Sequence, residues 1–81
     1  TGAALSPDGR RLAVVTPTEV LVYRRSGDEA WAAAVSRIPL RLPLPPMPQA
    51  EAVTWTADGR ALLVGGEQLP IRIHRLPLPG R

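Results

Sequence analysis

The chain contains no cysteine, which excludes disulfide bonds and cysteine-ligated metal centres as sources of stability. It also contains no phenylalanine, and its aromatic residues are two tryptophans and one tyrosine. A chain of 81 residues buries only about 60% of its unfolded surface on folding, and here the apolar residues are mostly alanine, valine and leucine. The sequence therefore predicts a thin hydrophobic core.

Lysine is absent as well, so all ten basic residues are arginine and the formal net charge is +3. This usage is typical of GC-rich bacterial genomes. Nucleic-acid binding favours basic residues clustered with exposed aromatic rings, whereas these arginines fall mostly where strands are predicted to end. We interpret them as a solvated rim and expect no nucleic-acid partner. No apolar run approaches the ~20 residues of a membrane span, and no signal peptide is visible, which leaves the compartment open.

Residues that could carry chemistry are few and dispersed. His74 is the only histidine, and its predicted place at the end of a strand favours packing over general-base work. The serines lack the flanking glycines of a nucleophile elbow. Glu19, Glu51 and Glu67 are too scattered to suggest a metal site. We therefore predict no catalytic, cofactor-binding or metal-ligating residue.

An internal repeat is the most informative feature of the chain. Ser6–Arg10 (SPDGR) returns as Thr56–Arg60 (TADGR), and the apolar residues that follow the two copies also align. An Asp-Gly pair between apolar runs indicates a hairpin, because glycine accepts a positive φ and aspartate bonds the nearby backbone. This role is favoured over a pair of catalytic carboxylates. The residues assigned to structural turns are Asp8, Gly9, Asp58 and Gly59.

A third strand is predicted after each turn. Val20–Arg24 follows the first copy and aligns, with a shift of one residue, with Ile71–Arg75. In the second segment apolar and polar residues alternate, which is typical of a half-buried strand.

The segment between the copies, Asp28–Leu40, is ambiguous. A capping box at Ser26–Glu29 would open a short helix, whereas the alternation of Trp31 and Val35 with smaller residues between them indicates a strand. We expect the strand, because a four-stranded repeat unit needs one more strand after the three already predicted. Seven short strands and no helix make the predicted fold all-β.

The pattern ALSPDGRRLAV at residues 4–14 resembles the blade signature of Tol-type and WD-repeat β-propellers, and residues 54–62 resemble it with Trp55 in the common aromatic position. Tyr23-Arg24 and His74-Arg75 stand where a WD repeat carries Trp-Asp, so the Tol-type form is closer. The resemblance implies four-stranded antiparallel blades: a first blade at 1–38 and three strands of a second at 51–76.

Propellers close with about four to eight blades, and fewer than two are expected here. We therefore expect the blades to be completed by the rest of a longer polypeptide, a cleaved companion, or copies of the same chain in a ring. The start at Thr1, within a predicted strand and without methionine, favours a fragment.

Two proline-rich stretches, at 39–50 and 77–81, are interpreted as connectors or edge segments, because proline cannot donate to a sheet ladder. Arg41–Pro45 and Arg75–Pro79 share the sequence RLPLP. A polyproline ligand for an aromatic-lined groove is the alternative interpretation.

The propeller families that the chain resembles include scaffolds, enzymes and receptors. The repeat, together with the lack of any catalytic set in this sequence, favours a protein-interaction or scaffold and sensor module over an enzyme. The alternatives are an enzyme propeller, a hydrolase or lyase completed by other blades, and a blade fragment that self-assembles into a ring. The candidate partner-binding residues are Arg24, Arg25, Arg72, His74 and Arg75.

Overall fold

The computed structural model describes residues 2–45, 50–66 and 73–79. Over these residues the chain forms seven strands and one short helix, which makes the fold all-β. The four-stranded sheet has the order β1-β2-β3-β4, and the three-stranded sheet has the order β5-β6-β7. The elements are β1 (Ala3–Leu5), β2 (Arg11–Val15), β3 (Glu19–Arg24), α1 (Trp31–Ala34), β4 (Leu40–Pro43), β5 (Ala50–Trp55), β6 (Ala61–Gly66) and β7 (Ile73–Pro77).

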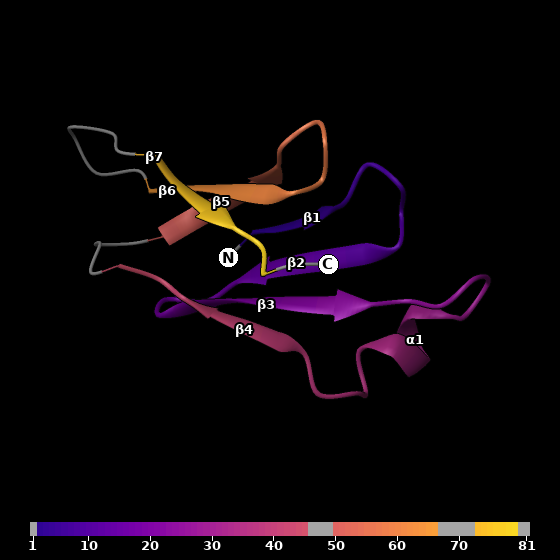
Figure 1. The fold of residues 1–81 in the computed structure, drawn as a ribbon. Coiled ribbons are helices and arrows are strands. Elements are labelled where there is room, and N and C mark those ends of the chain that lie inside the picture. The colour runs from indigo at the N-terminus through magenta and orange to yellow at the C-terminus, as the bar shows by residue number, and fades with distance from the viewer. Residues whose placement is uncertain (1, 46–49, 67–72, 80–81) are drawn as a thin grey trace.

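All neighbouring strands are antiparallel, and the two sheets lie one above the other (Figure 1). Strand β5 of the second sheet contacts both β1 and β2 of the first. The first strands of the two sheets are therefore close together.

Both Asp-Gly pairs form tight turns of the same construction. In the first turn, Asp8 Oδ1 accepts bonds from the Ser6 hydroxyl (2.6 Å) and the Arg10 amide (2.9 Å). In the second, Asp58 Oδ1 accepts from the Thr56 hydroxyl (2.7 Å) and the Arg60 amide (3.0 Å). The glycines that follow have φ angles of 73° and 71°. The repeated sequence thus builds a repeated hairpin, with the aspartate holding its own turn.

The core lies between the sheets, because alternate residues of each strand point to the other sheet. One buried cluster holds Ala13, Val15, Val20 and Val22 of the first sheet and Trp55, Leu62 and Val64 of the second.

The register places other residues on the opposite faces. We call these the outward faces. The outward face of the four-stranded sheet carries Leu5, Leu12, Val14, Leu21 and Tyr23, with the ion pair of Glu19 and Arg41 toward β4, and that of the three-stranded sheet carries Thr54, Leu63, Ile73 and Arg75.

The strand expected around Trp31–Val35 is wrong, because Trp31–Ala34 is helical. The guanidinium of Arg25 lies over the Trp31 ring at 4.8 Å, and Arg37 forms an ion pair with Glu29 and donates to the carbonyl of Arg24 (2.8 Å). These contacts join the helix to the residues on either side of it in the sequence, and its alanines favour the helical conformation.

The fourth strand is instead β4, within the stretch expected to be a connector. Leu44 N–H donates to Thr18 O (3.0 Å), so the register points the amide positions of Arg41 and Pro43 away from β3. Pro43 therefore occupies an edge position that needs no amide hydrogen.

Strand β7 repeats this arrangement with the second RLPLP copy. Leu78 N–H donates to Arg60 O (2.9 Å), which leaves Pro77 with its nitrogen toward the free edge. Both copies therefore form edge segments, with Leu42, Leu44, Leu76 and Leu78 packed against the core.

Among the described residues, no helix combines the length and apolar character needed to cross a bilayer.

Candidate interaction groove between the two turns

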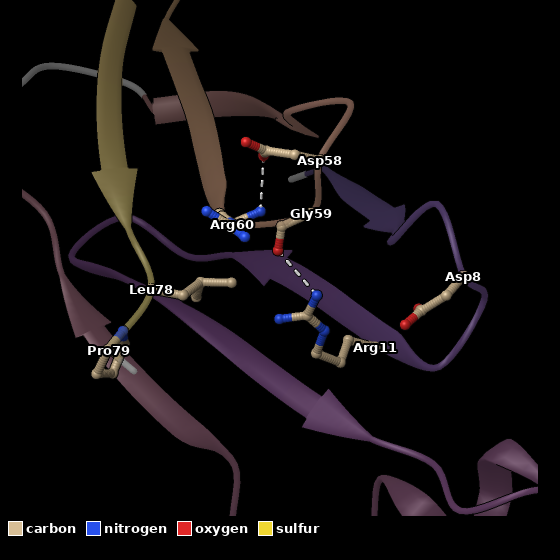
Figure 2. Close-up of a pocket in the computed structure, with 7 residues that line it drawn as sticks. All are labelled: Asp8, Arg11, Asp58, Gly59, Arg60, Leu78 and Pro79. Carbon is tan, nitrogen blue, oxygen red and sulfur yellow. Dashed lines mark hydrogen bonds between the residues drawn. The ribbon is translucent and has the colours of Figure 1, made fainter. Parts of the chain in front are cut away.

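A groove of about 640 Å³ opens where the two turns meet, and its lining comes from both sheets (Figure 2). The side chains and backbone that line it belong to Asp8, Arg11, Asp58, Gly59, Arg60, Leu78 and Pro79. A second hollow of about 250 Å³ shares Arg11, Leu78 and Pro79 with it, and Ile38 and Leu40 complete its apolar lining.

Arg11 fastens the two sheets together at this groove. Arg11 lies on the same face of β2 as the core residue Ala13, and its guanidinium lies 4.6 Å from the centre of the Trp55 ring. Its Nη2 donates to the carbonyl of Gly59 at 2.8 Å, as Figure 2 shows. A cation over an aromatic ring and a bond to a turn carbonyl both fix the orientation of the guanidinium. Ala61 occupies the equivalent position in the second copy, so only the first copy can make this contact.

The two aspartates of the groove are occupied by their own turns. The Ser6 hydroxyl, followed by the Arg10 amide, lowers the pKa of Asp8 below its ordinary value. The Thr56 hydroxyl, followed by the Arg60 amide, lowers the pKa of Asp58 in the same way. Both carboxylates are therefore charged near neutral pH and already accept hydrogen bonds.

The remaining lining is cationic and apolar. The Arg60 side chain is exposed, and Leu78 and Pro79 form another side of the groove. The groove can therefore offer guanidinium donors next to a small apolar wall, which suits a ligand that carries a carboxylate beside an apolar group.

The candidate partner-binding residues do not converge on this groove. Arg24 is exposed at the end of β3 and lines the smaller hollow, whereas Arg25 lies over Trp31 and donates to Gly9 O at 3.1 Å. His74 is half-buried on the inward face of β7, and Arg75 is exposed on the outward face. Arg72 lies outside the described residues.

Sequence reasoning missed Arg11 as a member of the site. A signal was present, because a charged residue stands at a core-facing position of β2 where the second copy has Ala61. A charged residue at a position where the other copy has alanine indicates a contact that only one copy makes.

Within the described ranges, the structure does not gather three or more histidine, aspartate or glutamate side chains at one place. The chain matches no protein-family model, no curated protein and no solved structure.

Replacing Gly59 by alanine is expected to destabilise the chain more than replacing Gly9. Both residues have a positive φ, which costs an L-residue about 1–2 kcal/mol. A Cβ at Gly59 would also lie 3.1 Å from Arg11 Nη2, whereas a Cβ at Gly9 meets no atom within 4 Å. Displacing Arg11 weakens its bond to Gly59 O, which adds about 0.5–1.5 kcal/mol. Urea unfolding of the two variants measures the difference, and equal losses would show that Arg11 does not fasten the sheets.

Proposed function

We propose that this chain is part of a β-propeller that serves as a protein-interaction or scaffold and sensor module. The observation that supports this proposal is that the same turn-and-strand unit forms both sheets. The two sheets stack with their equivalent faces pointing in the same direction. Trp55, Leu62 and Val64 face the first sheet, and their counterparts in the first copy, Leu5, Leu12 and Val14, face outward. In a propeller, successive blades likewise stack with their equivalent faces pointing in the same direction around the ring.

We further propose that the groove between the turns contacts the partner. It lies where two blade-like sheets meet, and the exposed Arg60 offers guanidinium donors, whereas the charged aspartates already accept hydrogen bonds within their turns. A peptide segment with a carboxylate beside an apolar side chain fits this lining. Binding of that kind needs no reacting group in the groove.

The test compares two arginines at the same position of the two turns. Arg60 lines the groove and Arg10 does not, and both side chains are exposed. Proteins retained by the immobilised chain and by the Arg10→Glu variant, but lost from Arg60→Glu, are identified and their purified forms titrated against all three. We expect the affinity to fall at least tenfold for Arg60→Glu alone, because its charge in the groove is reversed.

Two results would contradict this function. Equal affinities of Arg60→Glu and Arg10→Glu would remove the groove from partner binding. Turnover of a hydrolase or lyase substrate that Arg60→Glu abolishes would replace the interaction module with the enzyme.

A further inference from the structure

We infer that the outward face of the four-stranded sheet binds the outward face of the three-stranded sheet of a second copy of this chain. This inference rests on the proposed propeller-like repeat and names a partner for it. The two copies would meet head to tail, with different faces in contact.

The first argument is that both halves of this interface already meet inside the molecule. Trp55 and Leu62 pack against the inward face of the first sheet, and their repeat counterparts Leu5 and Leu12 lie on its outward face. On the other side, Val20 pairs with Val15 in the core of the first sheet, and Ile73, which pairs with Gly65 at the equivalent place, lies on the outward face of the second sheet. One molecule therefore carries the two complementary faces on its opposite sides.

The second argument is the apolar surface on these faces. Leu5 and Ile73 are 53% and 68% exposed, although they correspond to buried positions of the other copy. Leu12, Val14 and Tyr23 beside Leu5 are half-buried. Exposed apolar residues gathered on one face of a sheet favour a further layer.

The third argument weighs against an alternative contact through the outer sheet edges. Strand addition to β4 or β7 would need an unbroken row of outward amide hydrogens, and Pro43 and Pro77 interrupt that row. The expected contact is therefore face to face. With two sheets in each copy, closure at about four to eight blades takes two to four copies.

The experiment measures molar mass against concentration for the 81-residue chain and three arginine variants. Leu5→Arg alters one outward face, Ile73→Arg alters the other, and Ile38→Arg is the control, because Ile38 is 93% exposed and lies in the loop before β4. We expect the wild type and Ile38→Arg to rise above the 8.7 kDa of one chain, to two to four chains. Leu5→Arg and Ile73→Arg should each remain single chains, with far-UV circular dichroism unchanged.

Mixing the two face variants gives the sharpest result. Each retains the face that the other has lost, so an equimolar mixture should form pairs and nothing larger. Single chains at every concentration, or a mixture that fails to pair while the wild type associates, would overturn the inference. The groove titration with Arg60→Glu and Arg10→Glu is independent, so a failure here is distinguishable from a failure of the proposed function.

Discussion

Replacing Trp55 by alanine is expected to lower the free energy of unfolding by about 3–5 kcal/mol. The Trp55 side chain lies between the sheets in the buried cluster and is only 8% exposed. Its Nε1 donates to the carbonyl of Ala4 at 2.9 Å, which joins the second sheet to the first. Total stability for this length is about 4–12 kcal/mol, so the variant should lose at least about a quarter of it.

Far-UV circular dichroism during urea unfolding measures this loss without relying on the fluorescence of the residue removed. The control is Trp31→Ala, which removes the other tryptophan. Trp31 is half-buried on α1 and stacks with Arg25, outside the cluster between the sheets. Its removal should cost about 1 kcal/mol. Equal losses for the two variants would mean that the core is not centred on Trp55.

Much of the fold follows from local signals in the sequence. The Asp-Gly pairs specify their turns because the side chains that hold each turn lie within a few residues of one another, as with Ser6 and Asp8. The all-β class follows from several short apolar runs separated by turn residues. These features need no knowledge of distant contacts.

The segment around Trp31 could not be decided in this way. Its alternation fits a strand and its alanines fit a helix, and the interactions that accompany the helix come from neighbouring segments. Arg25 stacks on Trp31, and Arg37 pairs with Glu29. Periodicity over so few residues does not contain these contacts.

Strand β4 was missed for a different reason. Proline argues against a strand, but the objection applies only where the amide must donate within the sheet. Pro43 faces the free edge, and that register is known only from the bond of Leu44 to Thr18 O. The groove could not be predicted from the sequence for a similar reason. It depends on long-range packing, because Arg11 and Gly59 are far apart in the sequence.

The second large effect is expected for Leu62→Ala, with its neighbour Leu63→Ala as the matched control. Leu62 is fully buried at 0% exposure and is among the largest side chains buried to that degree. Truncating a buried leucine costs about 2–5 kcal/mol, because the cavity left between two rigid sheets closes only in part. Leu63 is half-buried on the outward face of the same strand, so its truncation in a dilute single chain should cost about 1 kcal/mol.

The same pair of variants also reports on assembly. Leu63 corresponds in the repeat to Ala13, which is fully buried between the sheets. If a second copy covers the outward face, the cost of Leu63→Ala should grow with protein concentration, whereas the cost of Leu62→Ala should stay constant. Thermal unfolding across a hundredfold range of concentration tests this difference. Equal costs for the two leucines in dilute solution would contradict the division of the chain into inward and outward faces.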